Sequence, residues 1–234
     1  MMLWYKAWLE TRWRFAFLVG SILLVWIAPL WLPSTGVTPG MIASRMWVAL
    51  QLESVLLSIL AAIYLAGAGI NTQTMYSATS GFHGSMLFTL SLPVSRARLL
   101  VARAGLGALE TCGLVVLMAG YMLFLKPGAV SALQAFDYMV RAVVCAMAVY
   151  ALSVLLACVL DEMWQFTGAC ILWVGFFLLQ SKVNMVSQIS PLRGMSLNCY
   201  PLTAPMPWAP VVASAVLAGV LLYASVLVLQ RKEY

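Results

Sequence analysis

Residues 139–160 read MVRAVVCAMAVYALSVLLACVL, an apolar run that contains one charged side chain, Arg141. The hydrocarbon core of a bilayer is about 30 Å thick and is crossed by about 20 helical residues. Backbone polar groups find no water in that core, so a spanning segment must satisfy its own hydrogen bonds, as a helix does. The absence of strict two-residue alternation argues against a strand of a β-barrel. The run therefore predicts a transmembrane helix.

Five more runs of this kind occur along the chain. We expect them to be helices as well, and the shortest to extend into residues 180–183. The sequence thus predicts an all-α integral membrane protein with six transmembrane helices, forming a single domain over residues 1–234. The five runs are 15–32, 48–70, 104–125, 166–179 and 209–229.

The composition supports a membrane protein and excludes a sizeable soluble domain. Of the 234 residues, 64% are hydrophobic and 9% are charged, whereas soluble domains average about 45–50% and about 25%. Too few polar residues remain to cover the surface of a soluble fold of this size. The net charge is +6, but the basic residues are scattered beside apolar runs, which favours contact with lipid headgroups over binding of nucleic acid.

The distribution of Lys and Arg predicts the orientation, because basic residues are in excess on the cytoplasmic side. The six-helix arrangement places eight basic residues on the side of the two termini and five on the other side. We therefore expect both termini and the loop 71–103 to be cytoplasmic. The eight are Lys6, Arg12, Arg14, Arg96, Arg98, Arg103, Arg231 and Lys232, and the five are Arg45, Lys126, Arg141, Lys182 and Arg193.

Residues 3–15 have the pattern of an amphipathic helix, which predicts an interfacial helix over residues 1–14 before the first span. Its apolar face and a charged row on the opposite face both follow helical spacing. Such a helix is expected to lie in the cytoplasmic membrane interface with its Trp side chains at headgroup level; the alternative is a basic flank that only sets the topology. The face consists of Trp4, Ala7, Trp8, Thr11 and Phe15, and the row of Lys6, Glu10 and Arg14.

The loop 71–103 contains a second short helical pattern. Phe82, Met86 and Leu90 are spaced four residues apart and share one helical face, and Pro93 ends the pattern before Arg96. An apolar stripe on the cytoplasmic side requires a partner, either the membrane surface or a groove on another protein.

The loop 180–208 is too apolar for a free linker. It contains four prolines together with Tyr200 and Trp208. We expect it to fold over the outer mouth of the bundle, as irregular backbone at membrane depth is tolerated where protein covers it.

The chain lacks the motifs of a nucleotide-binding or catalytic protein. It has no G-x-x-x-x-G-K-[ST] loop, and His83 is its one histidine, which excludes zinc or haem sites that need two imidazoles. Its five cysteines include no C-x-x-C pair and predict neither a metal site nor a disulfide framework. We therefore expect no enzyme activity, catalytic residue, metal or cofactor in this chain.

Three ionisable residues fall inside the predicted spans, where such groups are functional candidates. Glu110 lies roughly 10 Å beyond the cytoplasmic end of its span. It can pair with Arg103 or with another helix, or it can contact cargo or protons. Glu53 and Arg141 lie about one turn inside the outer ends of their spans, where each can form a structural pair or reach the interface as an anchor.

The run LSLPVSR at residues 90–96, followed by Leu99, Leu100 and Arg103, resembles the cytoplasmic-loop pattern of permeases of type-2 ATP-binding cassette exporters. In that family the pattern lies between the second and third spans, as it does here. The N-terminal segment and the tail 229–234 are similar to the family's pre-membrane helix and basic-acidic ending. The segment 80–85 differs from the family, because it lacks the carboxylate that relatives often carry there.

The resemblance implies a permease subunit of an ABC transporter in the inner (plasma) membrane of a prokaryote. It implies export through a path shared with a second permease subunit, driven by a separate ATPase that binds ATP and Mg. The loop helix would be the coupling helix, with Phe82, Met86 and Leu90 in contact with the ATPase and Arg96 fixing the helix end. The alternatives are a secondary transporter that uses Glu110 and a membrane assembly factor.

Overall fold

The computed structural model describes residues 2–31, 54–66, 96–125, 130–160, 162–197 and 199–231. Helices are the only regular secondary structure in these ranges, which confirms the all-α class. The elements are α1 (Met2–Trp31), the Ser54–Ala66 helix, α4 (Arg96–Leu125), α5 (Ala132–Val159), α6 (Glu162–Lys182), α7 (Asn184–Ile189), α8 (Pro191–Met195) and α9 (Trp208–Arg231).

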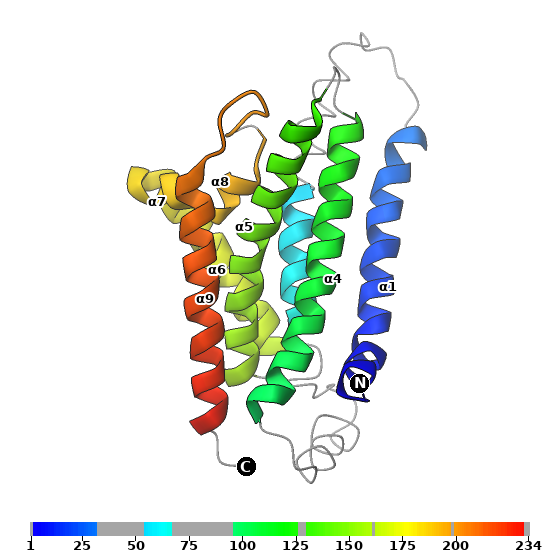
Figure 1. Ribbon diagram of the computed structural model, residues 1–234, viewed down its shortest axis with the longest axis vertical. Helices are drawn as coiled ribbons and strands as arrows, with labels where there is room; N and C mark the ends of the chain where they lie inside the picture. The colour runs from blue at the N-terminus through cyan, green and yellow to red at the C-terminus, as the bar shows by residue number, and fades with distance from the viewer. Residues whose placement is uncertain are drawn as a thin grey trace.

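Four of the described helices are long and apolar enough to cross a membrane. This result is consistent with a multi-pass membrane protein. Helix α1 and the Ser54–Ala66 helix lie alongside these four (Figure 1), and the count of six spans stays a prediction. The four segments are Leu100–Phe124, Ala132–Val159, Trp164–Lys182 and Trp208–Arg231.

The long helices lie side by side: α1, α4 and α6 run in one direction, and α5 and α9 run in the other (Figure 1). The start of α1 and the end of α9 lie at one end of the bundle, here called the terminal end. Helices α7 and α8 lie at the other end, here called the opposite end. The expected placement of both termini on one side of the bundle agrees with this arrangement.

Helix α5 occupies the centre and packs against α4, α6, α8 and α9. Its buried positions are dominated by small side chains, including Ala142, Cys145, Ala146, Ala148 and Ser153. Small residues let helix backbones approach closely, which drives association in lipid, where the hydrophobic effect does not. The composition of α5 therefore explains its central position.

Two helices begin earlier than the hydropathy pattern predicts. Helix α4 starts at Arg96, not at residue 104, so the last part of the predicted loop 71–103 is helical. Helix α5 starts at Ala132, not at residue 139, and Ser131 and Gln134 form a capping box there. Polar residues in a first helical turn lower hydropathy without opposing the helix, which explains both errors. The expected extension of the fifth run is confirmed, because α6 continues to Lys182.

The predicted interfacial segment is the beginning of α1, which continues without a break to Trp31. Ala7 and Thr11 are buried, and the Trp4 ring lies against Gly105 of α4. Part of the predicted apolar face therefore packs against protein and not against lipid. Trp8 keeps 40% of its surface exposed, so that side of the segment remains available to headgroups.

The described part of the loop 180–208 folds back on the bundle, as expected. Pro191, Leu192, Gly194 and Met195 of α8 are buried, and α8 packs against α5 and α9. A Cβ atom on Gly194 would lie 2.5 Å from Cys145 Sγ. The absence of a side chain at this position thus permits the close approach of α8 to α5.

Candidate functional site

The predicted coupling residues Phe82, Met86 and Leu90 lie outside the described residues. Arg96 is the first residue of α4, and its backbone alone is described. The run LSLPVSR therefore ends at the start of α4. The coupling helix itself stays a prediction. Glu53 also lies outside the described residues.

Glu110 of α4 is buried, with 6% of its surface exposed, and it pairs with another helix. Thr11 of α1 donates a hydrogen bond to Glu110 Oε1 over 2.6 Å. The second oxygen, Oε2, has no hydrogen-bond partner among the described residues. Of the arrangements left open by the sequence, the structure thus supports a contact between helices and places the partner 99 residues away in the chain.

The neighbouring turn of α4 makes an unusually close approach to two other helices. Tyr150 of α5 donates a hydrogen bond to the carbonyl oxygen of Ala104 over 2.7 Å. A Cβ atom on Gly107 would lie 2.5 Å from the Tyr150 hydroxyl and 3.2 Å from the Leu65 carbonyl oxygen. Glycine at this position therefore allows α4, α5 and the Ser54–Ala66 helix to meet at the level of Glu110.

The last described turn of the Ser54–Ala66 helix is bound by side chains from two other helices. Gln165 of α6 donates to the Ile63 carbonyl oxygen over 3.1 Å. Arg14 of α1 donates to the Tyr64 carbonyl oxygen over 3.3 Å, and its guanidinium lies 5.3 Å from the centre of the Tyr64 ring. These contacts fix the helix from which the chain enters the loop 71–103.

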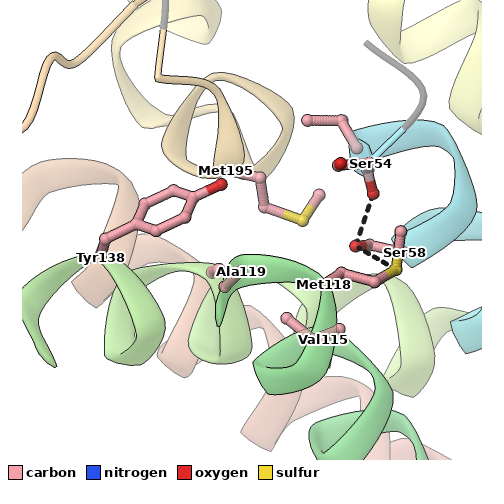
Figure 2. A pocket seen from close by; sticks show the side chains of 9 residues that line it. Ser54, Ser58, Val115, Met118, Ala119, Tyr138 and Met195 are labelled. Atoms are coloured by element: carbon pink, nitrogen blue, oxygen red, sulfur yellow. Dashed lines mark hydrogen bonds between the residues drawn. The ribbon is translucent and has the colours of Figure 1, made fainter. Parts of the chain in front are cut away.

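A small cavity of about 10 Å³ lies between the Ser54–Ala66 helix, α4, α5 and α8. This is about the space that one water needs. In Figure 2 the Tyr138 hydroxyl points toward Met195 on one side, and Ser58 bonds to the Ser54 carbonyl oxygen and to Met118 on the other. The cavity is therefore too small for cargo in this arrangement of the helices.

Arg141 is buried inside the protein, with 5% of its surface exposed, and of the two expected roles its contacts fit the structural one. Its guanidinium lies 5.3 Å from the Tyr138 ring centre and 5.8 Å from that of Tyr200. One terminal nitrogen donates to the Tyr200 carbonyl oxygen over 3.1 Å. The early start of α5 places Arg141 deeper in the helix than the predicted boundary did, and the segment that contains Tyr200 covers it.

Comparison with known proteins gives no relative: no family model, no curated protein and no solved structure matches the chain.

Sequence reasoning missed Thr11, Tyr150 and Tyr200 as partners of polar groups in the bundle. Thr11 belonged to a predicted lipid-facing stripe, and its contact with α4 depends on how two distant segments pack. One signal was readable, however. A threonine in an otherwise apolar face marks a position where a buried hydrogen bond can form, since a hydroxyl in lipid needs a partner.

Proposed function

We propose that the chain is the permease subunit of an ABC exporter, in which a second permease subunit completes the cargo path and a separate ATPase supplies energy. The observation that carries this proposal is the run LSLPVSR, whose final residue, Arg96, is the first residue of α4. The run thus leads directly into a long apolar helix, as in the family that it resembles.

The fold supports this proposal in two further ways. The terminal end carries the start of α1, the end of the Ser54–Ala66 helix and the start of α4, so the loop 71–103 connects helices at the end where an ATPase would bind. The cavity beside Tyr138 has room for about one water. A path that is wider than this would form between two permease subunits.

The coupling role is assigned to the stripe Phe82, Met86 and Leu90. An aromatic anchor in a groove is a typical interface hot spot, and its truncation costs about 2 kcal/mol or more, which is over tenfold in affinity. ATP and Mg would bind to the partner, because the chain has no phosphate-binding loop of its own.

The test is to purify the tagged chain from its native host in mild detergent and to measure co-purifying ATPase. We expect no hydrolysis by the isolated chain, hydrolysis by the complex, and at least tenfold weaker recovery of the ATPase after Phe82→Ala. The matched control is Phe136→Ala, an exposed phenylalanine near the start of α5, which should retain the partner. Wild-type recovery and coupled hydrolysis after changing Phe82, Met86 and Leu90 together would contradict the proposal.

Orientation has a separate test, which uses the exposed thiol of Cys199 between α8 and α9. If the termini are cytoplasmic, an impermeant maleimide added to intact cells should label Cys199 but not a cysteine introduced at Ser77. Labelling of both positions from outside would contradict the proposed topology.

A secondary transporter is the second candidate, and the unbonded Oε2 atom of Glu110 is the observation that favours it. In that case Glu110→Gln should abolish transport that is driven by a proton gradient while expression stays normal. In the ABC exporter the same change should leave transport per folded molecule nearly intact.

A further inference from the structure

The side chain of Arg141 is a buried cation near the opposite end of the bundle. The rest of the protein covers 95% of its surface. Two tyrosine rings flank the guanidinium, and the carbonyl oxygen of Tyr200 accepts a bond from one terminal nitrogen. Aromatic faces attract a cation, but they do not neutralise its charge.

No carboxylate forms an ion pair with Arg141 among the residues that the structure describes. Asp137 lies one helical turn earlier on α5, where it is partly buried; its charge acts on Arg141, but the two side chains form no ion pair. A buried charge without a direct ion pair is costly, and a charged side chain inside a spanning helix marks a functional position by default. No described residue meets the requirement of Arg141 for a direct anionic partner.

The unused donors of Arg141 indicate which ligand meets that requirement. Its Nε atom is buried and has no hydrogen-bond partner among the described residues. Nε–H together with a terminal N–H forms the fork that binds two oxygens of one carboxylate or phosphate group. We propose that Arg141, with the rings of Tyr138 and Tyr200, binds a phosphate group that enters from the opposite end.

Access depends on the segment that follows α8. Tyr200 is partly buried and the next residue, Pro201, is exposed, so the chain that covers Arg141 lies at the surface of the bundle. A ligand therefore reaches the guanidinium by displacing the Tyr200 carbonyl group and not by crossing the core. The phosphate group can belong to an anionic lipid headgroup or to soluble cargo. The site is independent of the proposed ATPase, because it lies at the other end of the molecule.

The experiment compares two phosphate probes on delipidated protein in neutral detergent. One probe is soluble glycerol 3-phosphate, with sodium chloride at equal ionic strength as reference. The other is reconstitution into nanodiscs of phosphatidylglycerol against phosphatidylcholine. Binding is measured as the shift of the thermal unfolding midpoint and as the Kd from calorimetry. We expect a response to at least one probe: glycerol 3-phosphate indicates soluble cargo, and phosphatidylglycerol alone indicates a lipid headgroup.

The variants separate the Arg141 site from general attraction of anions. Arg141→Met should weaken binding at least tenfold, since bonds to charged groups contribute about 1.5–3 kcal/mol. Lys182→Gln removes another positive charge from the same end, where Lys182 is exposed in the last turn of α6, and should bind as the wild type does. If Arg141→Met does not fold, Arg141→Lys keeps the charge without the fork and should show the same weakening.

Asp137→Asn tests the site without changing Arg141. Removing a nearby negative charge should strengthen phosphate binding. Weaker or unchanged binding in this variant would overturn the proposal, because Asp137 would then not compete with the ligand. Two further results would overturn the proposal. One is the same response of the wild type and of Arg141→Met to a probe, and the other is no response of the wild type to either probe.

Discussion

Helices α5 and α6 are both long and apolar enough to cross a membrane, but they have very different surroundings. In the most apolar stretch of α5, 61% of the residues are buried inside the protein, against 17% in that of α6. The buried positions of α5 are mostly Ala, Cys, Ser and Val, whereas the exposed positions of α6 include Ile171, Val174 and Phe177. Hydropathy identifies a spanning helix, but the size of its side chains indicates whether protein or lipid surrounds it.

The buried and the exposed residues of α6 lie on different faces of the helix. Gln165, Ala169 and Trp173 are buried, and their spacing of four residues places them on one face. The rest of the helix surface is largely exposed. Helix α6 therefore contributes to the core through one stripe, while α5 contributes on all sides.

The largest expected effect comes from enlarging a small residue of α5. Ala148 is fully buried, so Ala148→Leu should lower the free energy of unfolding in mixed micelles by about 3 kcal/mol through overpacking. Gly175→Leu in α6 is the matched control, because a Cβ atom there meets no atom within 4 Å. Its free energy of unfolding should stay near the wild-type value or rise. Similar losses in both variants would mean that the two helices have similar surroundings.

The next effect concerns the contact of α5 with α4. Gly107→Ala should cost about 2 kcal/mol, because the added Cβ atom would displace the Tyr150 hydroxyl from the Ala104 carbonyl oxygen. Adding Tyr150→Phe removes the obstructing hydroxyl, so the double variant should lose less stability than the sum of the single variants. Strict additivity of the measured unfolding free energies would contradict this contact. Gly113→Ala, at an open position of the same helix, should not destabilise the protein.

A smaller effect is expected at the polar contact between α1 and α4. Thr11→Val removes the donor to Glu110 and should cost about 1.5 kcal/mol, since it leaves a buried carboxyl group without its bond. Glu110→Gln retains an acceptor for Thr11 and should cost less. A double-variant cycle that gives no interaction energy between the two residues would show that they do not interact.

The smallest effect tests the buried stripe of α6. Gln165→Leu should cost about 1 kcal/mol, because it removes the donor to the Ile63 carbonyl oxygen. Ile171→Leu, on the exposed face of the same helix, should change the free energy by less than about 0.5 kcal/mol. If both changes are neutral, α6 contributes no specific polar contact to the core.

The sequence predicts the helices of this fold better than the contacts between them. The lengths of the apolar runs predicted most ends of α6 and α9 to within a few residues. The start of α5 was misplaced because hydropathy was read without the capping residues Ser131 and Gln134. The position of Glu110 inside a spanning helix was predicted, but its partner Thr11 was not, because 99 residues separate them. The surroundings of Arg141 likewise depend on Tyr200, which follows 59 residues later.

The hydrogen bond from Gln165 to Ile63 has a consequence for the order of events during synthesis. The two residues are 102 positions apart, and ribosomes add about 5–20 residues per second. The end of the Ser54–Ala66 helix is thus made about 5–20 s before its donor from α6 exists. Arg14, which is made earlier, is available to that helix end from the beginning. The N-terminal helix therefore holds the second one in place until the later half of the chain has entered the membrane.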